Sequence, residues 1–283
     1  MSRTLNMLAR LAALLVICCC AQPAAAAGSQ CPQFYLGSQG PNFIRPELAK
    51  QAREVCYSAY GFVHSGVSRT PLWSAEHLTA QAVTAARSLQ RENTFHPEPS
   101  LPPEERAELK DFFHSGMDRG HMTPSGDEPT QQAQYESFSL GNMIPQNSDN
   151  NQRLWEAIEA SVRNFAQREG DLYIVTGPIF DRDHQERIGG RVLVPARLFK
   201  AVYDPRQQRA AAYVTFNAAG DQWQTITIAQ LQDLIGIDVF PAMTPQAKAA
   251  GMQLPAPTPR DNHRSRAETG PSFLANLLDR RHN

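Results

Sequence analysis

The stretch from Met117 to Asp127 reads M-D-R-G-H-M-T-P-S-G-D, and the stretch from Leu140 to Glu159 reads L-G-N-M-I-P-Q-N-S-D-N-N-Q-R-L-W-E-A-I-E. In the first stretch, Asp118, Arg119 and His121 lie within four positions. A neutral imidazole can take a proton from water near neutral pH. A guanidinium can bind phosphate oxygens through two hydrogen bonds. These residue types, so close together, indicate cleavage of a phosphodiester.

The second stretch supplies neutral oxygen atoms from Asn142, Asn147, Asn150 and Asn151. A magnesium ion prefers oxygen ligands and keeps several waters, so one amide oxygen is enough for a sparse site. Asn151 and Glu159 lie eight positions apart, on one side of a helix but about 12 Å apart along its axis. Because a straight helix cannot bring both to one ion, we expect Glu159 to orient a water or an arginine beside the ion.

The clearest helix is predicted over residues 148–169, where Ser148 or Asp149 can cap the start and Gly170 can end it. Its inward face is predicted from apolar side chains at helical spacing, Trp155, Ile158, Val162 and Phe165. Other predicted elements are strands over 60–63, 71–78 and 172–176, a turn at Gly177-Pro178, a hairpin over 191–217, and short helices over 46–55, 104–112 and 228–235. Strands on both sides of a central helix, without regular βαβ alternation, predict an α+β fold with a mostly antiparallel sheet.

The N-terminal 27 residues have the order of a secretory signal peptide. Arg3 and Arg10 are followed by an apolar run that ends at Cys20, and small residues come next. A lipoprotein anchor at one of the cysteines 18–20 is the alternative. We therefore expect a secreted or periplasmic protein with an N-terminal arm (28–58), one domain (59–240) and a poorly ordered tail (241–283).

Loss of that segment would leave two cysteines, Cys31 and Cys56. Two cysteines in an exported chain favour one disulfide, and two unrelated buried thiols are the alternative. The formal net charge of −1 becomes about −3 without Arg3 and Arg10, so no global basic surface is predicted. Any binding of phosphates must then come from a local cluster of arginines. No transmembrane segment is predicted, and we expect no membrane partner.

Together these segments resemble the DNA/RNA non-specific endonuclease family, whose members share the ββα-metal fold. The matching segments are Asp118-Arg119-Gly120-His121, Asn142-Met143-Ile144-Pro145-Gln146, Asn150-Asn151-Gln152-Arg153-Leu154-Trp155 and Tyr173-Ile174-Val175-Thr176-Gly177-Pro178. In the first segment, Gly120 is expected to allow a backbone bend. The resemblance covers roughly residues 57 to 240. It implies that the central helix carries the metal ligand.

The resemblance implies catalytic roles for five residues, His121, Arg119, Asn142, Glu159 and Arg69. His121 matches the general base and Arg119 the phosphate-contacting arginine. Asn151 matches the single direct ligand of an Mg²⁺ or Mn²⁺ ion. Glu159 matches a helix glutamate near the waters of that ion. Arg69, in Ser-Arg-Thr-Pro-Leu-Trp, is matched more loosely to an arginine that supports the transition state, and a surface charge is the alternative.

The implied activity is metal-dependent hydrolysis of DNA and RNA to 5′-phosphate and 3′-hydroxyl ends. Contacts to backbone phosphates carry no sequence information, so low sequence specificity is expected. A non-catalytic nucleic-acid-binding protein with the same fold is one alternative. A phosphodiesterase that acts on another phosphate ester is the second, and only the acidic net charge favours it.

Overall fold

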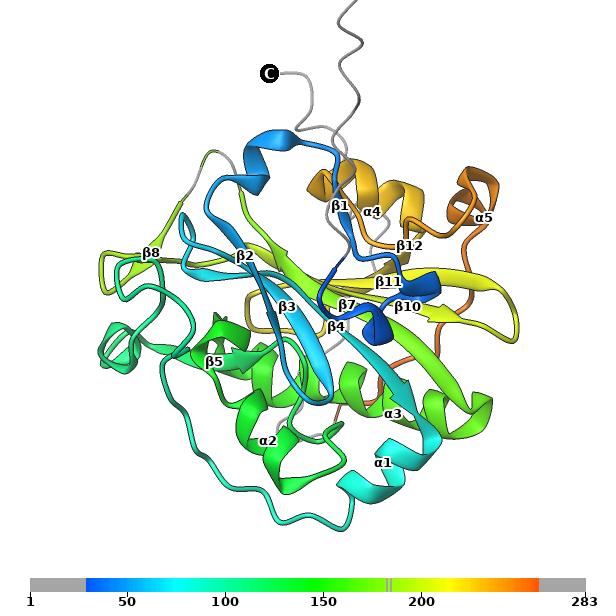
Figure 1. The fold of residues 1–283 in the computed structure, drawn as a ribbon, viewed down its shortest axis with the longest axis horizontal. Coiled ribbons are helices and arrows are strands. Elements are labelled where there is room, and N and C mark those ends of the chain that lie inside the picture. The colour runs from blue at the N-terminus through cyan, green and yellow to red at the C-terminus, as the bar shows by residue number, and fades with distance from the viewer. Residues whose placement is uncertain (1–28, 182, 184, 260–283) are drawn as a thin grey trace, which may run out of the picture.

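The computed structural model describes residues 29–181, 183 and 185–259. The expected signal peptide, residues 1–27, lies outside the described residues. A seven-stranded antiparallel sheet forms the centre, in the order β12-β11-β10-β7-β4-β3-β2 (Figure 1). Its strands are β2 (Ala52–Cys56), β3 (Tyr60–Ser65), β4 (Thr70–Thr79), β7 (Asp171–Ile179), β10 (Arg197–Asp204), β11 (Arg209–Phe216) and β12 (Trp223–Ile226). The α+β prediction with a mostly antiparallel sheet is confirmed.

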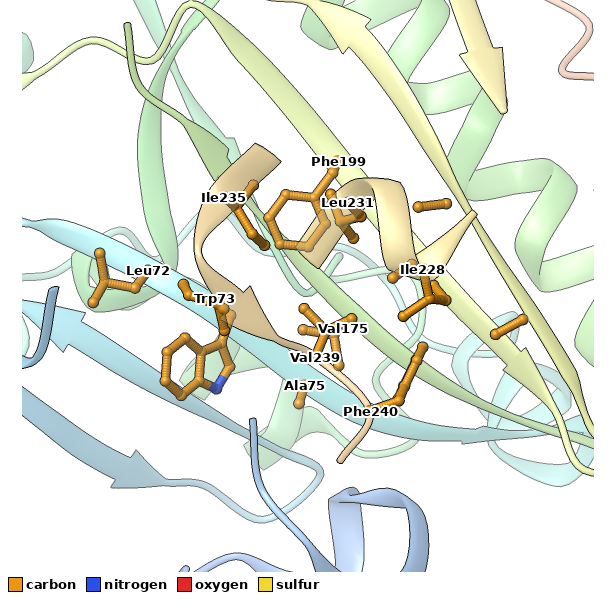
Figure 2. Close-up of a cluster of buried hydrophobic side chains, with 14 of the residues drawn as sticks. Leu72, Trp73, Ala75, Val175, Phe199, Ile228, Leu231, Ile235, Val239 and Phe240 are labelled. Carbon is orange, nitrogen blue, oxygen red and sulfur yellow. The ribbon is translucent and has the colours of Figure 1, made fainter. Parts of the chain in front are cut away.

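Helices cover both faces of this sheet. Because side chains alternate along a strand, Leu198 of β10 packs with the helix α3 (Glu156–Glu169), whereas Phe199 packs with α4 (Ile228–Ile235) on the opposite face. Figure 2 shows this second face, with Phe199 close to Leu231 of α4. The predicted helix over residues 228–235 is therefore confirmed. Among the described residues, no helix is long and apolar enough to cross a membrane.

A ββα unit lies beside the sheet and holds both quoted stretches. Strand β5 (Met117–His121) pairs antiparallel with β6 (Met143–Asn147). The chain then enters a π-helical segment, η6 (Asn150–Trp155), which continues directly into α3. A helix was predicted over residues 148–169 as one regular α-helix, and its first part instead has the wider π geometry. Such segments occur often at functional sites.

The remaining elements are short. The helices are α1 (Ala80–Ala86), α2 (Gln131–Ser137) and α5 (Pro245–Ala250), with 3₁₀ turns η1 (Pro32–Phe34), η2 (Leu36–Ser38), η3 (Pro46–Ala49), η4 (Leu109–Phe112) and η5 (Leu140–Asn142). Two further strand pairs are β1 (Asn42–Phe43) with β13 (Ile237–Asp238), and β8 (Arg187–Ile188) with β9 (Val192–Leu193).

Three sequence predictions of local structure were wrong. The helix expected over residues 104–112 is only the 3₁₀ turn η4 at the end of that range. The helix expected over residues 46–55 is the 3₁₀ turn η3 followed by the strand β2, which pairs with β3. The turn expected at Gly177-Pro178 lies inside β7. β4 pairs with β7 only as far as Thr176, so Pro178 has a strand partner on one side alone, Leu198 of β10. The space beside Gly177 is filled by the Phe199 ring, which favours glycine there.

The expected tail begins with ordered structure. Residues 241–259 include α5, and Met252 and Leu254 are buried in the same cluster as the apolar face of α3. The Tyr213 hydroxyl donates to the carbonyl of Pro255 at 2.6 Å. The Pro- and Ala-rich composition of this segment misled the prediction, because its contacts with the sheet are not visible in the sequence. Residues 260–283 of the expected tail lie outside the described residues.

Cys31 and Cys56 form the expected disulfide, with their Cα atoms 5.6 Å apart. The bond joins the start of η1 to the end of β2 at the edge of the sheet. It therefore ties the N-terminal arm to the domain.

We expect the substitution Cys56→Ser to lower the free energy of unfolding by about 3.5 kcal/mol, the chain-entropy value for a closed loop of this length. The loop spans 25 positions. Urea unfolding of the variant and of the reduced wild type should give the same loss. Alkylation of the denatured, unreduced protein followed by peptide mapping should label neither Cys31 nor Cys56. Labelling of both would contradict the pairing.

Candidate active site

A cleft of about 740 Å³ lies between β5, the loop before it and the beginning of the η6–α3 helix. The structure brings four of the expected site residues together in its lining, Arg119, His121, Asn151 and Glu159. Two others, Asn142 and Arg69, do not line it.

His121 is the last residue of β5, and its side chain is only 8% exposed. The imidazole packs edge-on against Phe138, with ring centroids 4.9 Å apart, and lies 5.8 Å from the ring of Phe95. Burial, and then the positive charge of Arg91, lower the pKa of His121 to about 3. The ring is therefore neutral at pH 7 and can accept a proton. Its Nε2 is buried and has no partner among the described residues, which leaves Nδ1 to meet a water in the cleft.

Gly120 has a different role from the bend that the sequence suggested. It lies in the extended strand β5, and a side chain there would collide with Gln146 of β6. Gln146 in turn donates from Nε2 to the Oδ1 of Asn150 at 2.8 Å. The glycine therefore allows the close approach of a buried amide that links the hairpin to the helix.

Asn151 is held by Asp118, a residue whose role was not predicted. Because a carboxylate only accepts hydrogen bonds, the Nδ2 of Asn151 donates to Oδ2 of Asp118 at 2.9 Å. Gln152 and Ser148 donate to the same carboxylate at 2.9 and 2.7 Å. Burial raises the pKa of Asp118, but these hydrogen bonds outweigh it and hold the pKa below its usual value. Asn151 lines the cleft, and its amide oxygen accepts no hydrogen bond from the described part of the chain.

The oxygen atoms that line the cleft are suitable ligands for a hard divalent cation. The Asn151 amide oxygen and the Glu159 carboxylate both line it, and oxygen ligands suit Mg²⁺ or Mn²⁺. Among the residues that the structure describes, no group of three His, Cys, Asp or Glu side chains gathers there, and the one such group found is the disulfide Cys31–Cys56 beside Glu54. The site is therefore sparse in protein ligands.

Glu159 lies one helical turn before Arg163 on α3. Burial raises the pKa of Glu159 to about 7, although the charges of Lys200 and Arg163 oppose the shift. The Nη1 of Arg163 contacts Glu159 at 4.0 Å and donates to the buried carboxylate of Asp127 at 2.8 Å. Arg163 also lines the cleft and was missed. The sequence feature that could have identified Arg163 is its spacing of four residues from Glu159, which puts both on one face of the helix.

Two more guanidinium groups line the cleft beside His121. Arg119 lies over the ring of Phe95, with 4.2 Å from its Cζ to the ring centroid. Arg91 lies over the ring of Phe138 at 5.2 Å. Neither forms a salt bridge with a carboxylate in the described part of the chain. Arg91 was not identified from the sequence, because it lies in a proline-rich loop with no motif around it.

Arg69 and Asn142 do not occupy the positions expected of them. Arg69 lies in the turn between β3 and β4 and donates to the backbone carbonyls of Glu104 and Arg191. Asn142 is fully buried, and its side chain bonds to the backbone of Thr123 in both directions. Asn142 therefore positions the segment that follows His121 and does not face the cleft.

Relatives and solved structures support this architecture. The chain is 31% identical over 225 residues to "Nuclease EXOG, mitochondrial" from Danio rerio, across 72% of this chain and 65% of that protein. It is 34% identical over 167 residues to "Mitochondrial nuclease" from Saccharomyces cerevisiae, across 54% of this chain and 49% of that protein. The match thus spans about half to two thirds of these relatives. A solved EndoG, in a complex with EndoGI, has the same fold, with a TM-score of 0.63 and 23% identity over 79% of this chain and 96% of that chain.

The expectation of a secreted or periplasmic protein was wrong by this comparison. Both relatives are named as mitochondrial nucleases, which points to mitochondria rather than to export. The sequence pattern misled because arginines without acidic residues at an N-terminus are shared by secretory and mitochondrial targeting segments.

The strongest comparison is at the level of the family. The model of the DNA/RNA non-specific endonuclease family matches residues 39–246, which include the ββα unit, the central sheet and part of the N-terminal arm. Both quoted stretches and every cleft residue described above lie within this match. The chain belongs to the DNA/RNA non-specific endonuclease family.

Proposed function

We propose that this chain is a metal-dependent endonuclease that hydrolyses phosphodiester bonds of DNA and RNA with low sequence specificity. The observation that carries the proposal is a buried, neutral His121 in one cleft with the free amide oxygen of Asn151. Three arginines line the same cleft, Arg91, Arg119 and Arg163. The proposed products carry 5′-phosphates and free 3′-hydroxyls.

The proposed metal is Mg²⁺ or Mn²⁺, and Asn151 would be its direct protein ligand. When bound, such an ion supplies charge stabilisation to the phosphate and to the leaving oxygen. Asp118 fixes the orientation of the Asn151 amide through its hydrogen bond. Glu159 lies on the same lining and would accept hydrogen bonds from waters around the ion.

Side chains of the protein would transfer the proton and stabilise the negative charge on the phosphate. His121 takes a proton from the attacking water, for which its neutral state is required. Arg119 and Arg91 bind the oxygens of the phosphate as its negative charge grows. The aromatic rings under both guanidiniums, Phe95 and Phe138, hold them in place.

Substrate contacts are proposed to be local, because the net charge of the whole chain is −1. A few arginines around one phosphate give little sequence information, so specificity should be low. The residues from 39 to 58 fall within the family match, with β1 paired to β13 and β2 paired to β3 of the central sheet, so the proposed domain includes much of the N-terminal arm.

The test is incubation of the purified chain with supercoiled plasmid, linear duplex DNA, single-stranded DNA and RNA, with Mg²⁺ and with EDTA. Metal-dependent cleavage of all four supports the proposal. Binding without cleavage would favour the non-catalytic alternative. Faster turnover of a small diester than of nucleic acid would favour a different phosphodiesterase.

On the acid side, the pH dependence of kcat/KM is expected to follow the titration of Glu159 and not that of His121. The pKa of Glu159 is raised to about 7, so its charged form is gained as pH rises through that value, and a bound cation would bring the pKa down from there. The pKa of His121 is about 3, so its protonation cannot reduce activity between pH 5 and 7. We expect kcat/KM to fall below an apparent pKa at or under about 7 in the wild type.

The measurement is kcat/KM from pH 5 to pH 9 at saturating Mg²⁺, for the wild type and for Glu159→Gln. The variant should be slower but nearly flat on the acid side, since the amide does not titrate. An unchanged acid limb in Glu159→Gln would contradict the assignment.

A further inference from the structure

Phe113 lies on the lip of the cleft with its ring in solvent. It is 73% exposed, the highest value among the exposed large hydrophobic side chains of the described residues. Leu109, 40% exposed, lies four positions earlier on the same lip, and both side chains line the cleft. Exposed aromatic surface beside a binding site usually marks a contact surface, because burying it in the free protein would be favourable.

The turn that carries Phe113 is fixed by hydrogen bonds. The Phe113 N–H donates to the carbonyl of Lys110 at 3.2 Å, and the Ser115 hydroxyl donates to the carbonyl of Phe112 at 2.9 Å. His114 has a φ of 54°, an uncommon value for a residue with a side chain. Just before it, Phe112 packs inward, 7% exposed, while Phe113 points outward.

The ring is therefore presented by a backbone that is already ordered. The ring centroids of Phe113 and His114 lie 3.9 Å apart with their planes tilted by 54°, so His114 packs against the Phe113 ring, and the Phe113 ring is the flat platform. A preformed platform loses little conformational entropy when a ligand covers it.

The surroundings of the platform select the ligand. Asp118, Glu156 and Glu159 also line the cleft, but Arg119 and Arg91 form no salt bridge with a carboxylate in the described part of the chain, so these two guanidiniums are available to a phosphate. A ligand with phosphates at one end and a flat apolar ring at the other fits both features. A nucleotide whose base is free to leave its stack is such a ligand, because every base has a π-face for an aromatic side chain.

We propose that Phe113 stacks on an unpaired base next to the scissile phosphate, so that strands with free bases are cleaved faster than continuous duplex. This inference rests on the proposed nuclease function and names the substrate class of the same cleft. A duplex must first unstack a base to reach the platform, at a cost of a few kcal/mol. A single strand has no such cost.

The experiment compares four proteins, wild type, Phe113→Ala, Phe113→Trp and the control Tyr135→Ala. Tyr135 is 48% exposed and lies on α2, outside the lining of the cleft. Each protein is given a single-stranded DNA oligonucleotide and the duplex of the same sequence. Phe113→Ala should lose about 5-fold to 100-fold in kcat/KM on the single strand, mostly through KM, and much less on the duplex. Phe113→Trp should keep the preference for single strands, and Tyr135→Ala should match the wild type.

A second measurement separates stacking from a structural role. Oligonucleotides that carry an abasic site at successive positions around one cleavage site are cleaved by wild type and by Phe113→Ala. At one position, the abasic site should lower the cleavage rate of the wild type as much as the substitution Phe113→Ala does. The same abasic site should not lower the cleavage rate of Phe113→Ala any further. Additive losses at every position, or equal loss on duplex and single strand, would overturn the stacking role. A wild type that cleaves no nucleic acid with metal would instead overturn the proposed function.

Discussion

His121→Ala is expected to give a folded protein whose kcat on DNA and RNA is at least about 100-fold lower than that of the wild type, the usual scale of general-base catalysis. The His121 imidazole has a pKa of about 3, so it is neutral at every pH used in the assay. Its removal takes away the proposed proton acceptor and leaves the arginines of the cleft in place. KM should therefore change much less than kcat.

The measurements are steady-state kinetics, far-UV circular dichroism and thermal unfolding of His121→Ala. Imidazole added to the variant should restore part of the rate, because the vacated space adjoins the cleft. His77→Ala is the matched control. His77 lies on β4, contacts Asp171 at 2.9 Å and stacks on Tyr173, outside the lining of the cleft. Near wild-type kcat in a folded His121→Ala would show that another group takes the proton.

The parts of this molecule that could be predicted are those fixed by local chemistry. Apolar side chains at helical spacing predicted α3, alternating or clustered β-forming residues predicted β3 and β4, and the turn at Asp204-Pro205 predicted the hairpin of β10 and β11. The two quoted stretches form one ββα unit, as the family resemblance implied, and it brings Arg119, His121, Asn151 and Glu159 to one cleft.

What could not be predicted depends on contacts between distant segments. Arg69 has a loose family match and Arg91 has no sequence signal, yet the fold places Arg91 at the cleft while Arg69 is bonded to carbonyls elsewhere. Asn142 carries an amide in a matching motif, yet the fold turns that amide toward the backbone of Thr123. Asp118 stands in the quoted motif, but its contact with Asn151 crosses 33 positions of sequence.

The wrong expectation of a straight helix has a bearing on the metal site. The rise of a regular α-helix puts about 12 Å between residues eight apart, which would separate Asn151 from Glu159. Here the first of the two lies in a π segment and the second in α3, and both line one cleft. Activity measurements on variants of both residues therefore decide which of the two side-chain oxygens binds the ion directly.

Asn151→Ala is expected to abolish detectable cleavage at every Mg²⁺ concentration. In the proposed site this side chain is the one direct protein ligand, so its loss removes the anchor that sets the position of the ion. EDTA should abolish wild-type activity without lowering the thermal unfolding temperature, because few protein groups hold the metal. Gln152→Ala is the control. This substitution removes a hydrogen bond of the same length, 2.9 Å, to the same Asp118 oxygen. It leaves the amide oxygen of Asn151, the proposed metal ligand, in place.

Glu159→Gln should do less damage than Asn151→Ala. The amide keeps the shape of the side chain and one acceptor oxygen, and changes to groups around a ligand shell cost about 10-fold to 100-fold. The comparison needs kcat and the Mg²⁺ dependence of both variants, with isothermal titration of metal in the absence of nucleic acid. Binding there should be weak for the wild type, since water and substrate phosphate would supply most of the ligands. If Glu159→Gln loses more activity than Asn151→Ala, the carboxylate is the direct ligand, and the amide held by Asp118 has the supporting role.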